Sequence, residues 1–183
     1  MHLETERLLL RPISLQDTDD IYEYSKNPNV GPNAGWKPHE SREETVELMK
    51  EIFLDKEDIF GIILKEKNKL IGSIGLTPDP KRVYDQVKML GYAVAEPYWN
   101  NGYTTEAARE IIRYAFEHLH LQLISVYCYP FNERSKSVIR KCGFEYEGTL
   151  KSAEKLYNGE IYDHVCFALK NNSDHRSQIE SFV

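Results

Sequence analysis

The spacing of apolar residues along the chain predicts a succession of strands and helices. Strands are predicted at 6–13, 59–65, 69–76, 87–95, 123–129, 144–150 and 161–169, and helices at 17–27, 41–53, 104–119 and 132–142. The clearest helix is 104–119, where apolar residues recur every three or four positions. Residues 27–40 contain too much proline, glycine and asparagine for regular structure. This order predicts an α/β fold with a mixed central sheet of about seven strands and flanking helices.

Short-range signals fix several of the predicted boundaries. Ser41 begins a capping-box pattern, Asn132 is typical of a helix N-cap, and Gly143 is typical of the left-handed residue that ends a helix. A helix separates the strand at 87–95 from the strand at 123–129, so we expect these two strands to be parallel.

Length and composition indicate one globular domain. The chain has 183 residues, of which 41% are hydrophobic and 28% are charged. This is enough for a substantial core, so we predict one domain over residues 1–170. Residues 171–183 are polar and unpatterned, and we expect them to form a loose tail.

Charge and cysteine content narrow the function classes. A net charge of -6 argues against binding nucleic acid through phosphate neutralisation. It would suit a cationic partner, although solubility alone also explains it. No apolar run reaches membrane length, and no signal segment is evident. The three cysteines form no CxxC pair and are expected to be free thiols in a reducing compartment. We therefore predict a cytoplasmic protein that binds neither nucleic acid nor membrane.

A polar turn stands between the predicted strand 87–95 and the helix at 104–119. It consists of Asn100, Asn101 and Gly102. A helix N-terminus offers unpaired N–H groups and partial positive charge, and small residues before it let an anion approach. From these residues alone, anion binding and simple helix capping both remain open. Glu106 in the first turn speaks mildly against an anion, unless its carboxylate points sideways or serves the helix dipole.

A resemblance to a known family favours the first alternative. The turn and helix, "EPYWNNGYTTEAA", resemble the acyl-coenzyme A signature of the GNAT acetyltransferases, with Trp99 at its first position. The preceding "LGYAV" and the following "NERSKSVIRKCGFEYEG" resemble the neighbouring blocks of that family, in the same order. The start "ETERLLLRPI" and the end "AEKLYNGEIYDHVCFAL" are similar to the RimJ/RimL-type branch. The resemblance covers about residues 3–170. Asn100 and Thr104 depart from it, since the branch often has Gly and Ala there.

The resemblance implies acetyl-CoA as co-substrate, held between two parallel strands that splay apart, here 88–95 and 123–129. The Val94 N–H would polarise the thioester carbonyl and stabilise the oxyanion that forms. The pyrophosphate would lie on the N–H groups of 101–105. The predicted cofactor-binding residues are Val94, Trp99, Asn100, Asn101, Gly102, Tyr103, Thr104, Thr105, Asn132 and Ser135. No metal site is predicted, because no histidine belongs to a recognisable ligand spacing.

The resemblance also implies roles in the chemistry. Glu154 matches the general base proposed for the N-terminal acetyltransferases, and its alternative reading is a solvated carboxylate before a hairpin. Ser135 matches the proposed donor to the leaving thiolate, and its alternative reading is a first-turn hydroxyl near the Asn132 cap. Ile139 stands where many family members have a tyrosine acid, so that acid is absent there.

The acceptor is predicted to be a primary amine, first of all the N-terminal α-amine of a protein or peptide. Polyamines, amino sugars and antibiotics remain alternatives, as do a non-catalytic acyl-CoA sensor and a generic phosphate-binding module. Trp36 and Tyr92 are predicted to wall the acceptor pocket, although aromatic residues more often serve packing. A homodimer is possible for the family.

Overall fold

The computed structural model describes residues 1–171; residues 172–183, most of the predicted tail, lie outside the described residues. The strands are β1 (Leu3–Glu4), β2 (Leu8–Arg11), β3 (Ile59–Leu64), β4 (Lys69–Pro78), β5 (Val87–Val94), β6 (Leu123–Cys128), β7 (Glu145–Lys155) and β8 (Ile161–Lys170). The helices are α1 (Thr18–Ser25), α2 (Gly31–Ala34), α3 (Arg42–Ile52), α4 (Tyr103–Glu117) and α5 (Glu133–Lys141), with short 3-10 turns at Leu15–Asp17, Lys65–Lys67 and Glu96–Tyr98.

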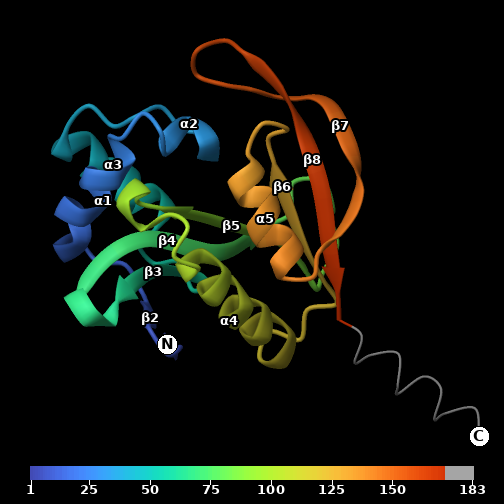
Figure 1. Cartoon of the computed structure of the whole chain (residues 1–183), viewed down its shortest axis with the longest axis horizontal. Helices are drawn as coiled ribbons and strands as arrows, with labels where there is room; N and C mark the ends of the chain where they lie inside the picture. The colour runs from blue at the N-terminus through green and yellow to red at the C-terminus, as the bar shows by residue number, and fades with distance from the viewer. Residues whose placement is uncertain (172–183) are drawn as a thin grey trace, which may run out of the picture.

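The strands form one mixed sheet in the order β1-β2-β3-β4-β5-β6-β8-β7. Neighbouring strands are antiparallel except β5 and β6, which are parallel, as the intervening helix predicted. The β7–β8 hairpin projects beyond the rest of the molecule at the top of Figure 1. The α/β fold with a mixed sheet is therefore confirmed.

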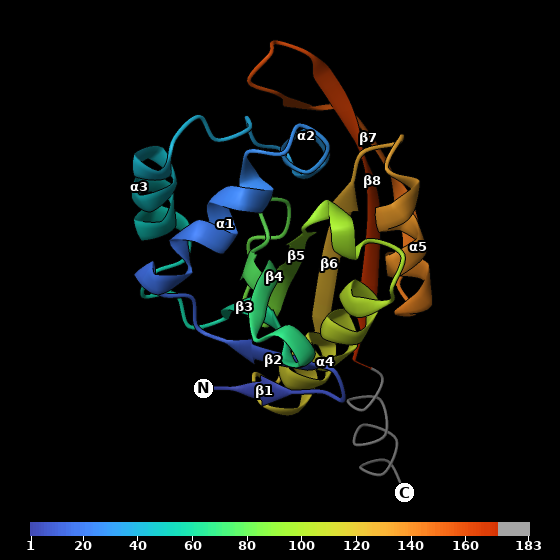
Figure 2. The same ribbon diagram turned by 60° about the vertical axis from the view of Figure 1, so that its left-hand side comes forward.

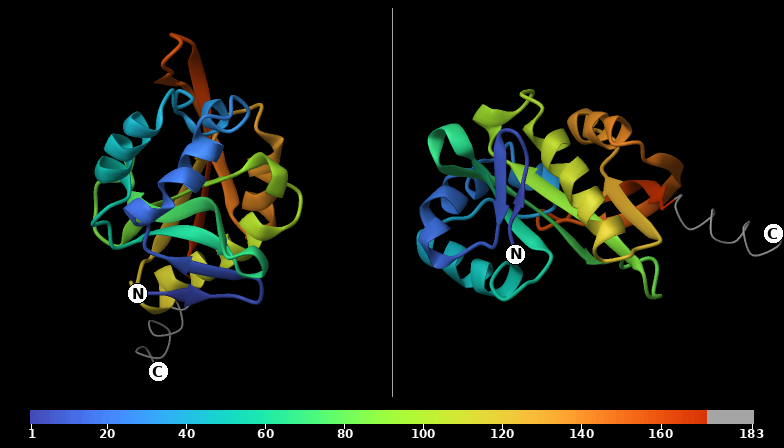
Figure 3. Two further views of the ribbon diagram at one scale, coloured as in Figure 1. Left: turned by 90° about the vertical axis from the view of Figure 1, so that its left-hand side faces the viewer. Right: turned by 90° about the horizontal axis from the view of Figure 1, so that it is seen from below.

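Helices cover both faces of the sheet, α1 and α3 on one side and α4 and α5 on the other (Figures 2 and 3). On the α4 face, Ala107 and Ile111 are fully buried against Leu8 and Leu10 of β2. On the α1 face, Ile21 and Met49 pack with residues of β3, β4 and β5. Strands β2 to β5 thus contribute residues to two cores, one on each face of the sheet, as a sheet with two covered faces requires. No helix within residues 1–171 is long and apolar enough to cross a bilayer.

The predicted caps form. The Ser41 hydroxyl accepts a hydrogen bond from the Glu44 N–H (3.0 Å), and the Asn132 side chain accepts one from the Ser135 N–H (3.0 Å). The Glu44 carboxylate accepts from the Glu40 N–H rather than from the Ser41 N–H, so the capping box is only half closed. Gly143 ends α5 with φ of +85°.

The structure differs from the prediction in four places. Strand β1 was not predicted, because its two residues are too few to show an alternating pattern. The segment 27–40 includes the single-turn helix α2, which the prediction missed because Gly31 and Pro32 favour irregular structure elsewhere. Strand β7 runs to Lys155 rather than ending at Leu150, because an irregularity after Leu150 breaks its alternation. Asn171, which was assigned to the tail, donates its N–H to the Gln122 carbonyl (2.9 Å).

Candidate active site

Strands β5 and β6 separate along their length. Their pairing is confined to Val87–Met89 against Leu123–Ser125, so β5 has no β6 partner from Leu90 onward. Val94 lies opposite Gly72 of β4, and the next residue, Ala95, donates its N–H to the Ile71 carbonyl (2.8 Å). In an antiparallel ladder this alternation turns the N–H and C=O of Val94 away from β4, toward the open side. The Val94 carbonyl there accepts a hydrogen bond from the Trp99 indole (2.7 Å).

The turn after β5 leads directly into α4, and the first N–H groups of α4 have no partner within the helix. Gly102 is the N-cap residue and has φ of +82°, a left-handed conformation that favours glycine. The Glu106 N–H donates to the Gly102 carbonyl (3.0 Å), which begins the helical ladder. The N–H groups of 103–105 therefore precede that ladder, at the positive end of the helix dipole.

Glu106 points away from this turn and is neutralised by the N-terminal hairpin. Its carboxylate accepts hydrogen bonds from the Thr5 hydroxyl (2.6 Å) and from the Arg7 N–H (2.9 Å), and it forms an ion pair with the Arg7 guanidinium (2.6 Å). Arg7 also donates to the Asn101 carbonyl (3.1 Å) and lies over the Tyr103 ring. The carboxylate thus fixes the turn against β2 instead of repelling an anion from it.

A cavity of about 380 Å³ opens beside the turn, between β5 and α5. Eight of the ten predicted cofactor residues line it: Val94, Trp99, Asn100, Gly102, Thr104, Thr105, Asn132 and Ser135. Asn101 and Tyr103 do not line it, so their predicted roles rest on their backbone N–H groups. Arg134 also lines it and places its guanidinium over the Trp99 ring, 4.1 Å from the centroid.

A second cavity, of about 690 Å³, lies on the α1–α3 face of the sheet and reaches the β7–β8 hairpin. Both predicted acceptor residues, Trp36 and Tyr92, line it, and so does Glu154. Tyr92, Asn132 and Ser135 line both cavities, so the two spaces meet at these side chains.

An irregularity in β7 sets the position of Glu154. Leu150 pairs with His164, but Glu154 pairs with Tyr162, so three residues of β7 stand opposite the single residue Asp163. Within this bulge Ser152 has φ of +51°, and its N–H donates to the Asp163 carboxylate (2.9 Å). A regular ladder would have set Glu154 opposite Glu160, two positions nearer the hairpin end. The bulge instead brings it beside His164.

Glu154 is held at one end of a hydrogen-bonded chain. Its Oε2 accepts from the Tyr129 hydroxyl (2.8 Å) and lies 2.8 Å from Nε2 of His164. The other ring nitrogen of His164, Nδ1, is 3.0 Å from Nζ of Lys81. An ammonium can only donate, so Nδ1 accepts and Nε2 carries the proton given to Glu154. Lys81 reaches this position because its N–H is fixed by the Asp79 carboxylate (2.8 Å).

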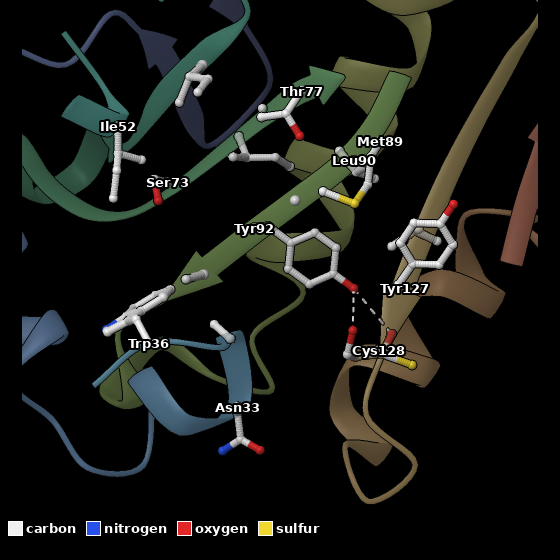
Figure 4. Close-up of a pocket in the computed structure, with 18 of the residues that line it drawn as sticks. Asn33, Trp36, Ile52, Ser73, Thr77, Met89, Leu90, Tyr92, Tyr127 and Cys128 are labelled. Atoms are coloured by element: carbon white, nitrogen blue, oxygen red, sulfur yellow. Dashed lines mark hydrogen bonds between the residues drawn. The ribbon is translucent and has the colours of Figure 1, made fainter. Parts of the chain in front are cut away.

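The Tyr92 hydroxyl lies 2.8 Å from the Ser135 hydroxyl and donates to the Ser135 carbonyl (3.3 Å), as the dashed lines in Figure 4 show. Burial raises the pKa of Tyr92 well above its ordinary value, so the phenol stays protonated at neutral pH. Burial likewise raises the pKa of the nearby Cys128 thiol to about 11. A thiol protonated in this way is a poor nucleophile.

Comparison with known proteins identifies the family. The family model described as "Acetyltransferase (GNAT) domain" matches residues 7–145. The chain belongs to the GNAT acetyltransferase family. It is 31% identical over 172 residues to the "Uncharacterized N-acetyltransferase YoaA" of Bacillus subtilis (strain 168), covering 91% of this chain and 95% of that protein.

Solved GNAT structures agree in fold. A GNAT-family acetyltransferase from Bacillus anthracis has a TM-score of 0.81 at 26% identity, covering 93% of this chain and 98% of the other. The ribosomal-protein-S5-alanine acetyltransferase of Vibrio fischeri has a TM-score of 0.72 at 25% identity, covering 94% and 97%. The predicted GNAT family and RimJ/RimL-like type are therefore confirmed, and the chain is a GNAT-type N-acetyltransferase.

GNAT enzymes use acetyl-CoA, which supplies an activated acetyl thioester. The residues around the smaller cavity have the chemistry that such a molecule would need. The unpaired edge of β5 offers backbone groups to the amides of the pantetheine arm. The N-terminus of α4 offers N–H groups to phosphates, and Arg134 adds a positive charge beside them. Glu106, the one feature that spoke against an anion, is paired with Arg7.

Sequence reasoning missed the residues that surround the predicted ones. His164, Lys81 and Tyr129 all contact the Glu154 chain of hydrogen bonds, and none was predicted. One signal was available for His164: it stands two positions after Tyr162 on the predicted strand 161–169, which follows Glu154 along the chain. Arg134 could have been found as a cation two residues after the Asn132 cap.

The ion pair of Glu106 gives the GNAT fold a measurable acid dependence. Burial raises the pKa of Glu106, but hydrogen bonds from Thr5 and Arg7 outweigh it, so the pKa lies below its ordinary value. The pair therefore contributes fully above the unfolded pKa of about 4.3 and is lost as the pH falls through the folded pKa. We expect Glu106→Gln to lower the free energy of unfolding by about 1–2 kcal/mol at pH 7.

Urea denaturation at pH 7 and at pH 3 measures the free energy of unfolding of the variant and of the unmodified protein. The difference between the two should be smaller at pH 3 than at pH 7. Glu117→Gln is the control in the same helix, because Glu117 is 58% exposed and pairs with the exposed Arg113. It should change stability by less than about 0.5 kcal/mol at either pH. A pH-independent effect of Glu106→Gln would show that the carboxylate charge is not what stabilises the turn.

Proposed function

We propose that this enzyme transfers acetyl from acetyl-CoA directly to the N-terminal α-amine of a protein or peptide, with Glu154 as the general base. The observation that carries the proposal is the hydrogen-bonded Glu154 carboxylate in a cavity that meets the cofactor cavity at Tyr92 and Ser135. The amine that gives its proton to Glu154 would enter from the larger cavity, and the thioester from the smaller one.

The nature of the base favours an α-amine. Glu154 is 38% exposed, so it is a carboxylate in contact with water rather than a strongly buried base. An α-amine has a pKa of about 8, and a lysine or polyamine amine has one of about 10.4. The α-amine is therefore the easier group for such a carboxylate to deprotonate, directly or through one water. A neighbour in fold that is named for ribosomal-protein-S5-alanine supports the same acceptor class.

The remaining residues would complete the transfer. The Val94 N–H, which faces away from β4, would donate to the acetyl carbonyl oxygen as negative charge develops there. The amine proton passes to Glu154, the N–C bond forms and the C–S bond breaks. The Ser135 hydroxyl, backed by Tyr92, would give the departing sulfur a hydrogen bond. Since burial keeps the Cys128 thiol protonated, no acyl-enzyme is required.

A thiol-release assay tests the proposal. The enzyme is given acetyl-CoA and a peptide with a free α-amine, the same peptide with a blocked α-amine and an internal lysine, spermidine, or an amino sugar. We expect CoA release and a mass gain of one acetyl group with the free α-amine alone. Release only with spermidine or the amino sugar would refute the peptide acceptor. Tight acetyl-CoA binding without release on any amine would indicate a sensor instead.

A further inference from the structure

The floor of the larger cavity contains a residue without a side chain, Gly91. Gly91 of β5 lies opposite Gly75 of β4 and is solvent-exposed although it stands in the middle of the sheet. A methyl group built on Gly91 would meet no other atom within 4 Å. Glycine weakens a strand, so an interior glycine facing open space indicates that the space itself is used.

Much of the wall around this floor is apolar, although Ser73 and Thr77 of β4 also line the cavity. Met49 and Ile52 from α3 and Met89 from β5 line the cavity, together with Ile59 and Phe53. Figure 4 labels Ile52, Met89 and Tyr92 among the residues that line this cavity. The apolar walls and the Glu154 end belong to one cavity, so whatever presents an amine to Glu154 also meets these side chains.

Charge argues against a polycation in this space. Among the described residues that line the cavity, Glu154 is the one carboxylate, and Lys81 is a cation at the same end. A second ammonium of a polyamine would be desolvated among Met49, Ile52 and Met89 with no carboxylate to pair with it. A single amine attached to an apolar body avoids this cost.

We infer that the acceptor carries a large apolar side chain beside its amine, as a peptide beginning with Met, Leu or Phe does. The inference rests on the proposed function and names its substrate class. The apolar side chain lies over Gly91 between α3 and β5, while the α-amine lies at Glu154. The cavity of about 690 Å³ has the volume of a small-molecule site, so it has room for a large apolar side chain, which alanine and serine lack. Each methylene buried there contributes about fourfold in affinity.

A panel of peptides that differ only in their first residue tests this. We expect kcat/KM for Met, Leu and Phe to exceed that for Ala and Ser by at least about tenfold. A free apolar monoamine, phenylethylamine, distinguishes a peptide acceptor from a small-molecule acceptor. Activity on phenylethylamine well below that on the Phe peptide supports a peptide. Activity above that of every peptide would assign the site to small amines and overturn the inference that the acceptor is a peptide. Equal rates for all first residues would overturn the inference.

Variants of Gly91 test whether the first side chain of the acceptor lies over Gly91. Gly91 has no positive φ, so Gly91→Ala and Gly91→Leu add bulk to open space without backbone strain. We expect a graded loss, with Gly91→Leu lowering kcat/KM for the Phe peptide at least about tenfold and removing its advantage over the Ala peptide. Thermal stabilisation by acetyl-CoA, measured for each variant, shows that fold and cofactor binding persist. Retention of the Phe preference in Gly91→Leu would place the side chain elsewhere.

A charge variant provides an independent readout. Ile52 is 45% exposed at the cavity rim, so Ile52→Glu is tolerated by the fold and adds the missing carboxylate. It should lower kcat/KM for the Phe peptide and raise that for spermidine. Leu15→Glu is the matched control, because Leu15 is 49% exposed and does not line the cavity; it should change neither. If no free α-amine is acetylated at all, the proposed function fails; if α-amines are acetylated without regard to the first side chain, only this inference fails.

Discussion

Glu154→Gln is expected to lower kcat about 100- to 10,000-fold, the range that a positioned general base contributes. Glutamine keeps the size of the side chain and an oxygen that can accept from the Tyr129 hydroxyl, so the fold and the cavity persist. It cannot take a proton from the amine. Steady-state kinetics with a free α-amine peptide and saturating acetyl-CoA measure the effect, and the KM for acetyl-CoA should change little because Glu154 does not line the smaller cavity.

Glu160→Gln is the control for this prediction. Glu160 lies in the same β7–β8 hairpin, is exposed, and accepts a hydrogen bond from the Asn158 side chain (2.9 Å) outside the cavity. Its replacement should leave kcat within about twofold. If Glu154→Gln also stayed within twofold, the carboxylate would be the solvated residue of the alternative reading, and the amine would have to lose its proton to water.

The neighbours of Glu154 sharpen the same test. His164 touches the carboxylate and is itself held by Lys81, so it acts on the reaction by positioning Glu154. His164→Asn should lower kcat by less than Glu154→Gln does, and the double variant should be no worse than Glu154→Gln alone. Groups that act as a unit give such non-additive effects. Independent, additive losses would mean that His164 has a role apart from the carboxylate.

Gly102→Val is expected to weaken CoA binding at least about 100-fold. A β-branched side chain is strongly disfavoured at φ of +82°, so the turn must change shape. The N–H groups of 103–105 would then no longer point toward the phosphates of CoA. Two lost hydrogen bonds to a charged phosphate, at about 1.5–3 kcal/mol each, account for that factor. Isothermal titration with CoA measures it.

Gly143→Val separates this effect from simple strain. Gly143 has φ of +85°, nearly the same as Gly102, but it lies at the C-terminal end of α5 and does not line the smaller cavity. Both variants should lose about 1–2 kcal/mol of stability in urea denaturation. Only Gly102→Val should lose CoA affinity. A normal affinity in Gly102→Val would remove the turn from the binding site.

Features that depend on neighbouring residues were predictable from the sequence, and features that depend on register were not. The caps at Ser41, Asn132 and Gly143 are local, and all three are present, although the capping box at Ser41 is only half closed. The parallel pairing of β5 and β6 follows from one intervening helix. The full chain of contacts around Glu154 could not be predicted, because it depends on the bulge at 151–153 and on Lys81, which lies 73 positions earlier in the chain, in the loop between β4 and β5.

The same distinction applies at the turn. The signature around Gly102 was visible in the sequence. Whether the Glu106 carboxylate would repel an anion from the turn was not. Its partners Thr5 and Arg7 come from the other end of the sequence, 101 and 99 positions away. Periodicity and motif spacing carry no information about such a contact, which exists because β2 and α4 pack on one face of the sheet.

The short β5–β6 ladder joins the two halves of the sheet by backbone pairing at one end only. From Leu90 and Val126 onward no backbone hydrogen bond of the described ladder ties one half to the other. A modest change in their separation therefore breaks no strand pairing. Side chains join the halves across the mouth instead: Tyr92 contacts Ser135, Asn132 donates to the Asn33 carbonyl (3.2 Å) and Arg134 lies over the Trp99 ring. Widening the mouth would therefore break these side-chain contacts and none of the ladder hydrogen bonds, with the three paired residues of each strand as the pivot.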